Sequence, residues 1–184
     1  MDWQKYFESL GFDPDDLLVV VDMQNDFVTG ALGTKRAQEI VPGIVELVKF
    51  FPGRKDFTKD THDENYLDTQ EGRNLPILHT QIGKWGWDIV PTIKALITDR
   101  DLVIQKYGFG STYFFESIQR CSYKRVWFVG LCTDKCVISN AVAAKVADPE
   151  IEVHIIEPLC GGVTKELHDN AINAMAALQM VIHR

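Results

Sequence analysis

Cysteine is scarce in this chain, which has four in 184 residues: Cys121, Cys132, Cys136 and Cys160. Four cysteines are too few for a disulfide scaffold at this length, so we expect free thiols and a reducing, cytoplasmic setting. Long hydrophobic runs are missing too, because no apolar stretch approaches the ~20 residues that span a bilayer. The segment Met1–Phe12 has no basic region followed by an apolar core. We therefore expect neither a membrane partner nor a secretory signal.

Positive charge is in deficit, since 19 Lys and Arg residues stand against 26 Asp and Glu residues and give a net charge of -7. This balance argues against a nucleic-acid partner held by a basic surface. Internal repeats, low-complexity segments and linkers are lacking as well. With 46% hydrophobic residues, the composition is that of a globular protein. We expect a single domain over residues 1–184, in which residues 1–16 form an N-terminal helical extension.

Short apolar runs alternate with segments of helical spacing. The runs predict strands over Leu17–Val21, Lys55–Lys59, Leu102–Gln105, Val126–Val129, Ile151–Ile156 and Met180–Ile182. Spacing and capping residues predict helices over 2–10, 38–51, 88–97, 111–121, 137–147 and 164–178. This alternation predicts an α/β fold of three layers, with a six-stranded parallel sheet and helices on both faces.

The stretch Arg125–Ala144 joins a strand to a helix around Cys136. Thr133 or Asp134 is expected to cap that helix, which places Cys136 in its first turn, just past the carboxyl end of a buried strand. Free N–H groups and the helix dipole favour an anion there, so we expect a lowered thiol pKa and a reactive thiolate. The alternative is an ordinary buried cysteine, which is also our expectation for Cys160.

Two other predicted strands end in charged residues. Asp22 follows Leu17–Val21, and Lys106 follows Leu102–Gln105, both of which we expect to be buried strands. A carboxylate at the end of an apolar run is costly unless it is paired or used, and open α/β sheets keep their sites at the carboxyl ends of strands. Asp22 is therefore a candidate acid/base. The alternatives are a loop cap for Asp22 and a surface lysine for Lys106.

Residues 62–87 are polar and without periodicity, and we expect a long functional loop there. This segment and the strand end before it contain Asp60, His62, Glu71 and His79. Oxygen and imidazole ligands of this kind suit zinc, manganese or iron(II). A solvated loop with polar side chains is the alternative reading.

Three segments together resemble the signature segments of the isochorismatase-like cysteine hydrolases. They are Leu18–Phe27, Lys106–Ser111 and Gly130–Val137. Asp60-Thr-His62 with His79 resembles the metal loop of the nicotinamidase (pyrazinamidase) branch of that family. The resemblance runs from about Leu17 to the C-terminus and implies an isochorismatase-like, Rossmann-like fold.

The resemblance assigns a role to each residue. It makes Cys136 the nucleophile, Asp22 the general base and acid, and Lys106 their electrostatic partner. It implies an oxyanion hole formed by the backbone N–H groups of Cys132 and Cys136. It also implies a cis peptide bond between Leu131 and Cys132.

The same resemblance implies a metal cofactor and a small amide substrate. Asp60, His62 and His79 would bind a divalent metal, zinc in the first place with manganese or iron as alternatives, and Glu71 would be a fourth ligand. Phe27 would stack on the substrate ring. The implied reaction converts nicotinamide to nicotinate and ammonia through a thioacyl-enzyme, in a homo-oligomer.

The chain also departs from the nicotinamidase pattern. A tryptophan that helps to sandwich the substrate ring has no clear counterpart, and for Trp85 or Trp87 we expect packing in at least one case. Cys132 replaces a smaller residue. Three rival functions therefore stay open: hydrolysis of another small amide (carbamoyl or maleamate-like), vinyl-ether hydrolysis of isochorismate, and a non-catalytic metal or thiol sensor that uses Cys132 and Cys136 as a redox pair.

Overall fold

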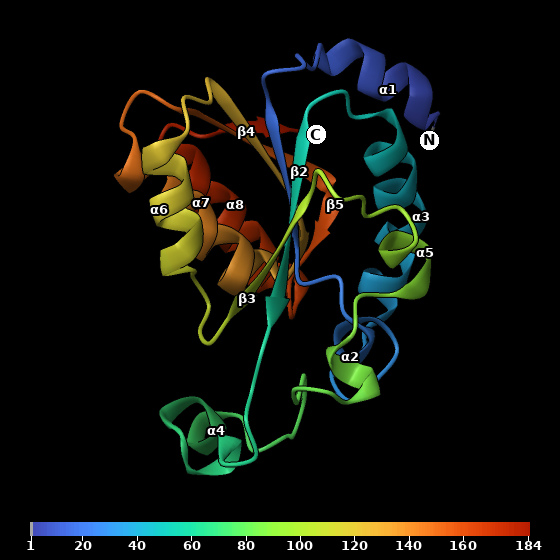
Figure 1. The fold of residues 1–184 in the computed structure, drawn as a ribbon, viewed down its shortest axis with the longest axis vertical. Helices are drawn as coiled ribbons and strands as arrows, with labels where there is room; N and C mark the ends of the chain where they lie inside the picture. Colours follow the sequence, from blue (N-terminus) through green and yellow to red (C-terminus); the bar gives the residue numbers. More distant parts are fainter. Residues whose placement is uncertain (1) are drawn as a thin grey trace.

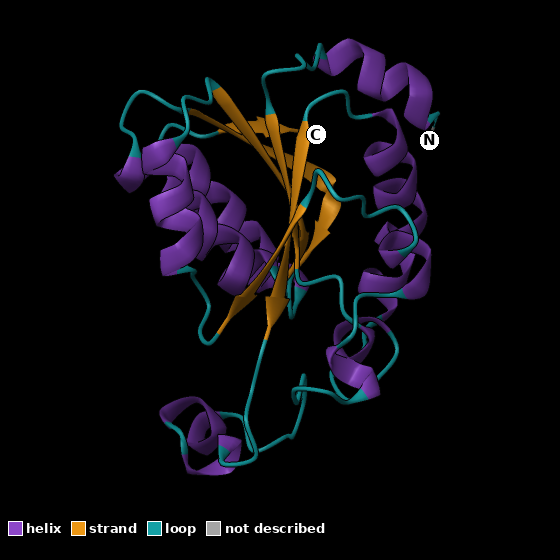
Figure 2. Ribbon diagram, viewed as in Figure 1, coloured by secondary structure: helices purple, strands orange, loops and turns teal. Residues whose placement is uncertain are grey.

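The computed structural model describes residues 2–184, and its centre is a single parallel sheet (Figures 1 and 2). The strand order is β3-β2-β1-β4-β5-β6, and all neighbours are parallel. The fold class is the predicted one. The strands are β1 (Leu17–Val21), β2 (Arg54–Asp60), β3 (Leu102–Lys106), β4 (Arg125–Leu131), β5 (Glu152–Gly161) and β6 (Val181–His183).

Helices cover both faces of the sheet. Figure 1 shows α3 and α5 on one face, with α1 beside α3, and α6, α7 and α8 on the other. The small helix α4 lies apart, beyond the carboxyl end of β2. The α-helices are α1 (Trp3–Leu10), α2 (Asn25–Val28), α3 (Lys35–Phe50), α4 (Gln70–Asn74), α5 (Pro91–Lys94), α6 (Thr112–Arg120), α7 (Ile138–Ala147) and α8 (Lys165–Ala177). Shorter turns are the 3-10 helices η1 (Tyr66–Asp68) and η2 (Trp85–Trp87) and the π-helix η3 (Thr133–Val137).

The central strand β1 has an apolar side chain at every position because the core lies on both of its faces. Leu18 and Val20 belong to the apolar cluster beneath α3, whereas Leu17, Val19 and Val21 belong to the cluster beneath α6, α7 and α8. Successive side chains of a strand point to opposite faces. The continuous apolar run is therefore what a strand between two helical layers requires.

The predicted N-terminal helix is present. The Asp2 side chain accepts a hydrogen bond from the N–H of Lys5, and Gly11 ends the helix in the left-handed region. Trp3, Tyr6 and Leu10 pack against the cluster under α3, in which Phe7 is buried. Met1 lies outside the described residues. Among residues 2–184, no helix combines the length and the apolar character needed to cross a membrane.

Three predictions about elements were wrong in part. Leu102–Gln105 was expected to be a buried strand, but β3 lies at the sheet edge, where Val103 is 45% exposed. Residues 62–87 are not one irregular loop, because η1, α4 and η2 form there from local caps such as Thr69, which accepts from the N–H of Gly72. The helix expected over 88–97 is α-helical only from Pro91 to Lys94.

The strand β5 is longer than expected, so Cys160 lies within it and not after it. Pairing with β4 is interrupted between Phe128 and Gly130, and it resumes with Gly130 opposite Cys160. The irregularity accommodates Pro158, which has no N–H to donate. Cys160 is fully buried, and its burial raises the pKa of the thiol to about 12. These surroundings agree with the purely structural role that we expected for Cys160.

A histidine pair at the other sheet edge leads to a prediction about pH and stability. His154 of β5 and His183 of β6 approach to 2.9 Å between ring nitrogens, and both rings contact Trp127. Burial lowers the pKa of both imidazoles. The unfolded chain, with a histidine pKa near ~6.5, therefore binds protons first, and stability falls as the pH drops through that value.

The check compares the wild type with His154→Gln in urea unfolding between about pH 7.5 and about pH 5. We expect the unfolding free energy of the wild type to fall toward that of the variant as the pH decreases. A difference in unfolding free energy that grows toward acid pH would show that the sign is wrong.

Candidate active site

The predicted catalytic residues converge at the carboxyl edge of the sheet. Lys106 Nζ lies 2.7 Å from Asp22 Oδ2 and 3.2 Å from Cys136 Sγ. Asp22 follows β1, Lys106 ends β3, and Cys136 lies in η3 after β4. Because these strands are parallel, their ends meet on one side. Asp22 and Cys136 are thus both within hydrogen-bonding distance of the Lys106 ammonium group, as the predicted triad requires. Their catalytic roles stay predictions.

Asp22 is fixed by Thr58, which the sequence analysis did not single out. Asp22 has a φ of 48°, in the left-handed region that few residues other than glycine adopt. Thr58 Oγ1 donates a 2.6 Å hydrogen bond to Asp22 Oδ1 and accepts one of 3.2 Å from the Asp22 N–H. Burial raises the pKa of Asp22 and outweighs the opposing charge of Lys106. This carboxylate is therefore a stronger base than an exposed aspartate.

Lys106 joins the triad to the predicted metal ligands. Its Nζ also lies 3.2 Å from Asp60 Oδ1 and 3.1 Å from the carbonyl oxygen of Gly108. Burial lowers the pKa of Lys106, but the carboxylates of Asp22 and Asp60 raise it well above its ordinary value. The ammonium group thus stays charged in a place where only 2% of the residue is exposed.

The predicted lowering of the Cys136 pKa was wrong. Burial raises the pKa of this thiol well above its ordinary value, and the negative charge of Asp22 adds to the effect, although Lys106 opposes it. The expected cap was also wrong. Thr133 Oγ1 instead contacts His168 Nδ1 at 2.8 Å, and Asp134 Oδ1 accepts from the N–H of Val163. Desolvation therefore outweighs the helix dipole, and the resting cysteine is a neutral thiol.

The peptide bond between Leu131 and Cys132 is cis, as the resemblance implied. Cys132 precedes the turn η3 and lines the same cavity as Cys136. Burial raises the pKa of the Cys132 thiol to about 12, so this thiol is neutral as well. The oxyanion hole formed by the N–H groups of Cys132 and Cys136 stays a prediction.

Asp60, His62 and His79 form a group that can hold a metal ion. Their candidate ligand atoms lie within 4.8 Å of one another, and all three residues are buried. Asp60 Oδ2 is 3.0 Å from His62 Nε2 and 3.7 Å from His79 Nε2. The carboxylate of Glu71 lies 3.9 Å from His62 Nε2, and its part as a fourth ligand stays a prediction.

Two observations show that this donor set fits a divalent cation. Buried His62 Nε2 lies 3.0 Å from Asp60 Oδ2, and no hydrogen bond of good geometry joins the two atoms. A cation between them would bind both atoms. His79 Nδ1 lies 2.7 Å from the Ile77 carbonyl oxygen. A carbonyl can only accept, so Nδ1 carries the proton and Nε2 offers its lone pair to a metal.

Several residues that hold this group were missed by sequence reasoning. The Gln24 side chain accepts from the Asp60 N–H and donates to the Asp60 carbonyl, and Thr80 Oγ1 donates to Asp60 Oδ2. Tyr66 is fully buried, and its ring packs on the rings of both His62 and His79. Thr58 could have been found by alternation, because it lies two positions before Asp60 and shares its face of β2.

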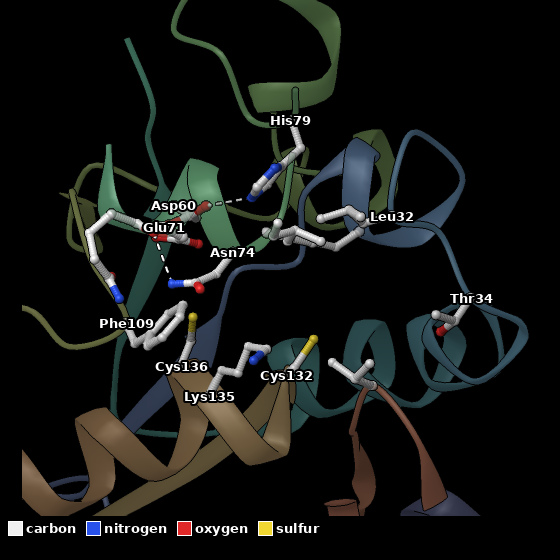
Figure 3. Close-up of a pocket in the computed structure, with 14 residues that line it drawn as sticks. Leu32, Thr34, Asp60, Glu71, Asn74, His79, Phe109, Cys132, Lys135 and Cys136 are labelled. Atoms are coloured by element: carbon white, nitrogen blue, oxygen red, sulfur yellow. Dashed lines mark hydrogen bonds and ion pairs between the residues drawn. The ribbon is translucent and has the colours of Figure 1, made fainter. Parts of the chain in front are cut away.

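A cavity of about 500 Å³ opens onto these groups (Figure 3). Cys136, Asp60, Glu71 and His79 line it, and so does Phe27, whose ring meets that of His79 edge to face. The cavity is thus lined by the predicted nucleophile, by the predicted metal ligands other than His62 and by the predicted aromatic wall. It lies within the range of about 300–1,000 Å³ that is usual for small-molecule sites.

Neither tryptophan near this loop lines the cavity. Trp87 packs under Lys59, and its Nε1 donates to Thr61 Oγ1. It therefore has the packing role that we expected for at least one of the two tryptophans. Trp85 is 60% exposed. The second ring of the cavity is instead Phe109, which follows Lys106 in the glycine-rich turn.

Zinc binding is expected to raise the melting temperature of the protein. A ligand at 100 times its dissociation constant stabilises a folded protein by about 2.7 kcal/mol, which is roughly 5–10 °C for a chain of this length. His79→Ala should lose most of that shift because a ligand is missing, whereas His183→Gln, outside the cavity, should keep it. Differential scanning fluorimetry with and without zinc is the measurement. An equal shift in His79→Ala and the wild type would exclude this site.

Comparison with solved structures places the fold among known hydrolases. A pyrazinamidase from Pyrococcus horikoshii in complex with zinc has a TM-score of 0.81 and 25% identity, covering 93% of this chain and 99% of that one. PnC1 from L. infantum, in complex with nicotinate, has a TM-score of 0.82 and 22% identity, covering 94% of each chain. N-carbamoylsarcosine amidase from Thermoplasma acidophilum has a TM-score of 0.77 and 23% identity, covering 92% and 95%.

A comparison with curated protein sequences found no match. The family description of the isochorismatase domain, however, matches residues 16–183. That range starts just before β1 and contains every residue of the site described above. With almost the whole sequence matched, the chain belongs to the isochorismatase family of hydrolases.

Proposed function

We propose that the protein is a metal-dependent cysteine amidohydrolase that converts nicotinamide to nicotinate and ammonia through a thioacyl-enzyme. The observation that carries the proposal is the position of Lys106 Nζ, which contacts Asp22, Cys136 and Asp60 at 2.7 to 3.2 Å. A nucleophile, a base and a metal ligand therefore meet around one ammonium group, beside the cavity that Cys136 and Asp60 line.

In the first half of the reaction, the thiol proton of Cys136 moves to Asp22 while the sulfur attacks the carboxamide carbon. Because burial raises the pKa of both groups, the proton passes from a weak acid to a strengthened base. The carbonyl oxygen becomes an oxyanion, which the N–H groups of Cys132 and Cys136 would stabilise. Lys106 compensates the negative charge that the proton transfer leaves on the sulfur.

In the second half, the oxyanion collapses and the carbon–nitrogen bond breaks. Asp22 returns the proton to the leaving nitrogen, which departs as ammonia, and a thioester with Cys136 remains. Asp22 then takes a proton from water, whose oxygen attacks the thioester carbon. When the carbon–sulfur bond breaks, Asp22 gives this proton to the sulfur, and the acid leaves as nicotinate after losing its own proton to solvent. The cycle is balanced, because one water is consumed and the three triad residues are restored.

Asp60, His62 and His79, with Glu71 as a fourth ligand, would hold a divalent cation, zinc in the first place. When bound, this ion supplies a Lewis-acid position for the pyridine nitrogen of the substrate. The zinc complex of the Pyrococcus horikoshii pyrazinamidase and the nicotinate complex of the L. infantum protein support the choice of metal and ring. Phe27, at the cavity wall, would stack on that ring.

The test is to incubate zinc-loaded protein with nicotinamide and to measure ammonia and nicotinate together. We expect equimolar release of both, well above the rate without protein. If the protein releases ammonia from other small amides but not from nicotinamide, nicotinamide is not the substrate. The protein would then still be an amidohydrolase.

A second candidate is hydrolysis of a carbamoyl amide. The similarity to N-carbamoylsarcosine amidase, with a TM-score of 0.77, favours including such a substrate in the panel. The two candidates differ in their demand for metal. Activity on a carbamoyl amide that survives both a chelator and His62→Ala would favour this second candidate.

The proposal includes a cytoplasmic homo-oligomer. The aromatic residues Trp3 and Tyr6 of α1 are only partly buried, which leaves part of their surface for a second copy. Light scattering behind a sizing column gives the mass in solution. A monomer at all concentrations would contradict this part of the proposal.

A further inference from the structure

The side chain of Asn140, in the first turn of α7, is fully buried and has a partner for each of its polar atoms. Its Nδ2 donates to the carbonyl oxygen of Cys136 at 2.7 Å and to that of Phe109 at 3.1 Å. Its Oδ1 accepts a 3.1 Å hydrogen bond from the N–H of Ser111. This amide therefore joins the backbone of two segments: η3, which carries the predicted nucleophile, and the turn after β3.

The partners fix the orientation of the Asn140 amide. With its nitrogen and oxygen exchanged, an NH2 group would face the N–H of Ser111, and an oxygen would face two carbonyl oxygens. A hydroxyl could not replace the amide, because it has one proton and two carbonyls need a donor. The position therefore requires an amide, and no step of the proposed reaction accounts for that requirement.

The turn after β3 depends on side chains for its hydrogen bonds. In the part of the chain that the structure describes, the backbone groups of residues 107–110 form no hydrogen bond with another backbone group. Gly108 and Gly110 add no side chains to hold the turn, and glycine has the most conformational freedom to lose. The carbonyls of this turn instead accept from Lys106 Nζ, at 3.1 Å, and from Asn140.

The two segments that Asn140 joins also hold the two sides of the contact between nucleophile and lysine. Cys136 Sγ lies 3.2 Å from Nζ of Lys106, the residue directly before the turn. On the cavity side, Lys135 Nζ lies 5.3 Å from the centre of the Phe109 ring. A cation–π contact is weak at a site that is only partly buried. The buried amide is therefore the stronger connection between the segments.

A buried amide that joins two segments fixes their separation, because moving either one would leave a buried N–H or carbonyl without a partner. We infer that Asn140 is a positioning residue, which holds the Cys136 sulfur at the Lys106 ammonium group by joining η3 to the turn after β3. Asn140 does not line the cavity, and it acts through the backbone of Cys136. The consequence for catalysis rests on the proposed function, whereas the positioning itself does not.

The first test measures ammonia release from nicotinamide by zinc-loaded Asn140→Ala and Asn140→Ser. A Ser hydroxyl in a helix can still donate to the carbonyl four residues earlier, here that of Cys136, but it is too short to reach the turn after β3. Both variants should lower kcat on the order of 10- to 100-fold, because a misplacement of ~1 Å at a reacting group can cost about that much. KM should change by less than about threefold, since no contact with substrate is removed. Asn140→Ser keeps the test available if Asn140→Ala does not fold.

The second test measures how fast iodoacetamide, a small uncharged reagent, alkylates Cys136, with peptide mass mapping to assign the label. Cys136 is only 6% exposed in the wild type. Loss of the Asn140 hydrogen bonds should release its sulfur toward the cavity, so both variants should be alkylated on the order of 10-fold faster. A slower amidase with a faster-reacting thiol indicates a displaced nucleophile, because a thiol that had merely become less nucleophilic would be alkylated more slowly.

Met175→Ala is the matched control for a general loss of stability. Met175 is fully buried near the C-terminal end of α8 and does not line the cavity, and truncating a buried methionine lowers the stability of the fold. We expect its kcat and its Cys136 alkylation rate to stay within about twofold of the wild type. Changes as large as those in the Asn140 variants would overturn the inference, because a loss of stability alone would then explain them.

The two tests distinguish failure of the inference from failure of the proposed function. If the wild type releases no ammonia from nicotinamide or from other small amides, the proposed function is refuted, and the alkylation rates alone decide the inference. An alkylation rate that is unchanged in the Asn140 variants would overturn the inference whether or not the protein is an amidase. In an active amidase, an unchanged kcat in Asn140→Ser would overturn it as well.

Discussion

Cys136→Ala is expected to lower kcat for amide hydrolysis by about 10⁴-fold or more, because the reaction loses its nucleophile. The thiol lies 3.2 Å from Lys106 Nζ, and burial raises its pKa. Asp22 and Lys106 are paired with each other at 2.7 Å, so the thiol is the group of the triad that we expect to form the covalent intermediate. The remaining residues can still bind substrate, so the loss should appear in kcat far more than in KM.

Two measurements separate a catalytic from a structural cause. Rapid acid quenching of the wild type with substrate should give a protein mass increased by the acyl group, and the variant should give none. Removing one buried sulfur should cost only about 1 kcal/mol of unfolding free energy. Cys121→Ala, which changes a thiol outside the cavity, is the matched control. Hydrolysis by Cys136→Ala at the rate of Cys121→Ala would end the proposed mechanism.

The fold was predictable because its physical causes are local. The apolar runs of β1 and β4 have no polar face, and a strand of that kind requires helices on both sides. The edge position of β3 was not predictable in the same way. Leu102 and Ile104 pack inward while Val103 and Gln105 are exposed, and which strand ends the sheet depends on the order of pairing.

The site was predictable in its residues but not in its electrostatics. Strand ends placed Asp22, Lys106 and Asp60 at one edge, since parallel strands share a direction. The sign of the Cys136 pKa shift depends on how deeply the thiol is buried, and the spacing of residues in the sequence does not give that depth. Lys135 and Phe109 line the cavity only because η3 and the turn after β3 face each other, and this contact joins residues distant in sequence.

Lys106→Met is expected to lower kcat by about 10³-fold or more and to reduce the unfolding free energy by about 3–5 kcal/mol, the cost of leaving buried charges without a partner. Lys106 is 2% exposed and contacts both Asp22 and Asp60. Without it, the pKa values of Asp22 and Cys136 should rise further, because Lys106 now lowers both. At neutral pH the base is then partly protonated and the thiol is harder to ionise.

The stability loss should depend on pH with a defined sign. In the variant, the folded-state pKa of Asp22 lies further above the unfolded value of ~3.9, so the folded state binds protons first as the pH falls. The stability difference between wild type and variant is therefore largest near neutral pH and shrinks toward acid pH. Lys49→Met is the matched control, since it breaks an exposed 2.8 Å pair with Glu46 on α3 and should cost at most about 1 kcal/mol. Urea unfolding between about pH 7.5 and about pH 4.5 measures both variants, and a Lys106→Met deficit that widens in acid would mean that Lys106 does not compensate these carboxylates.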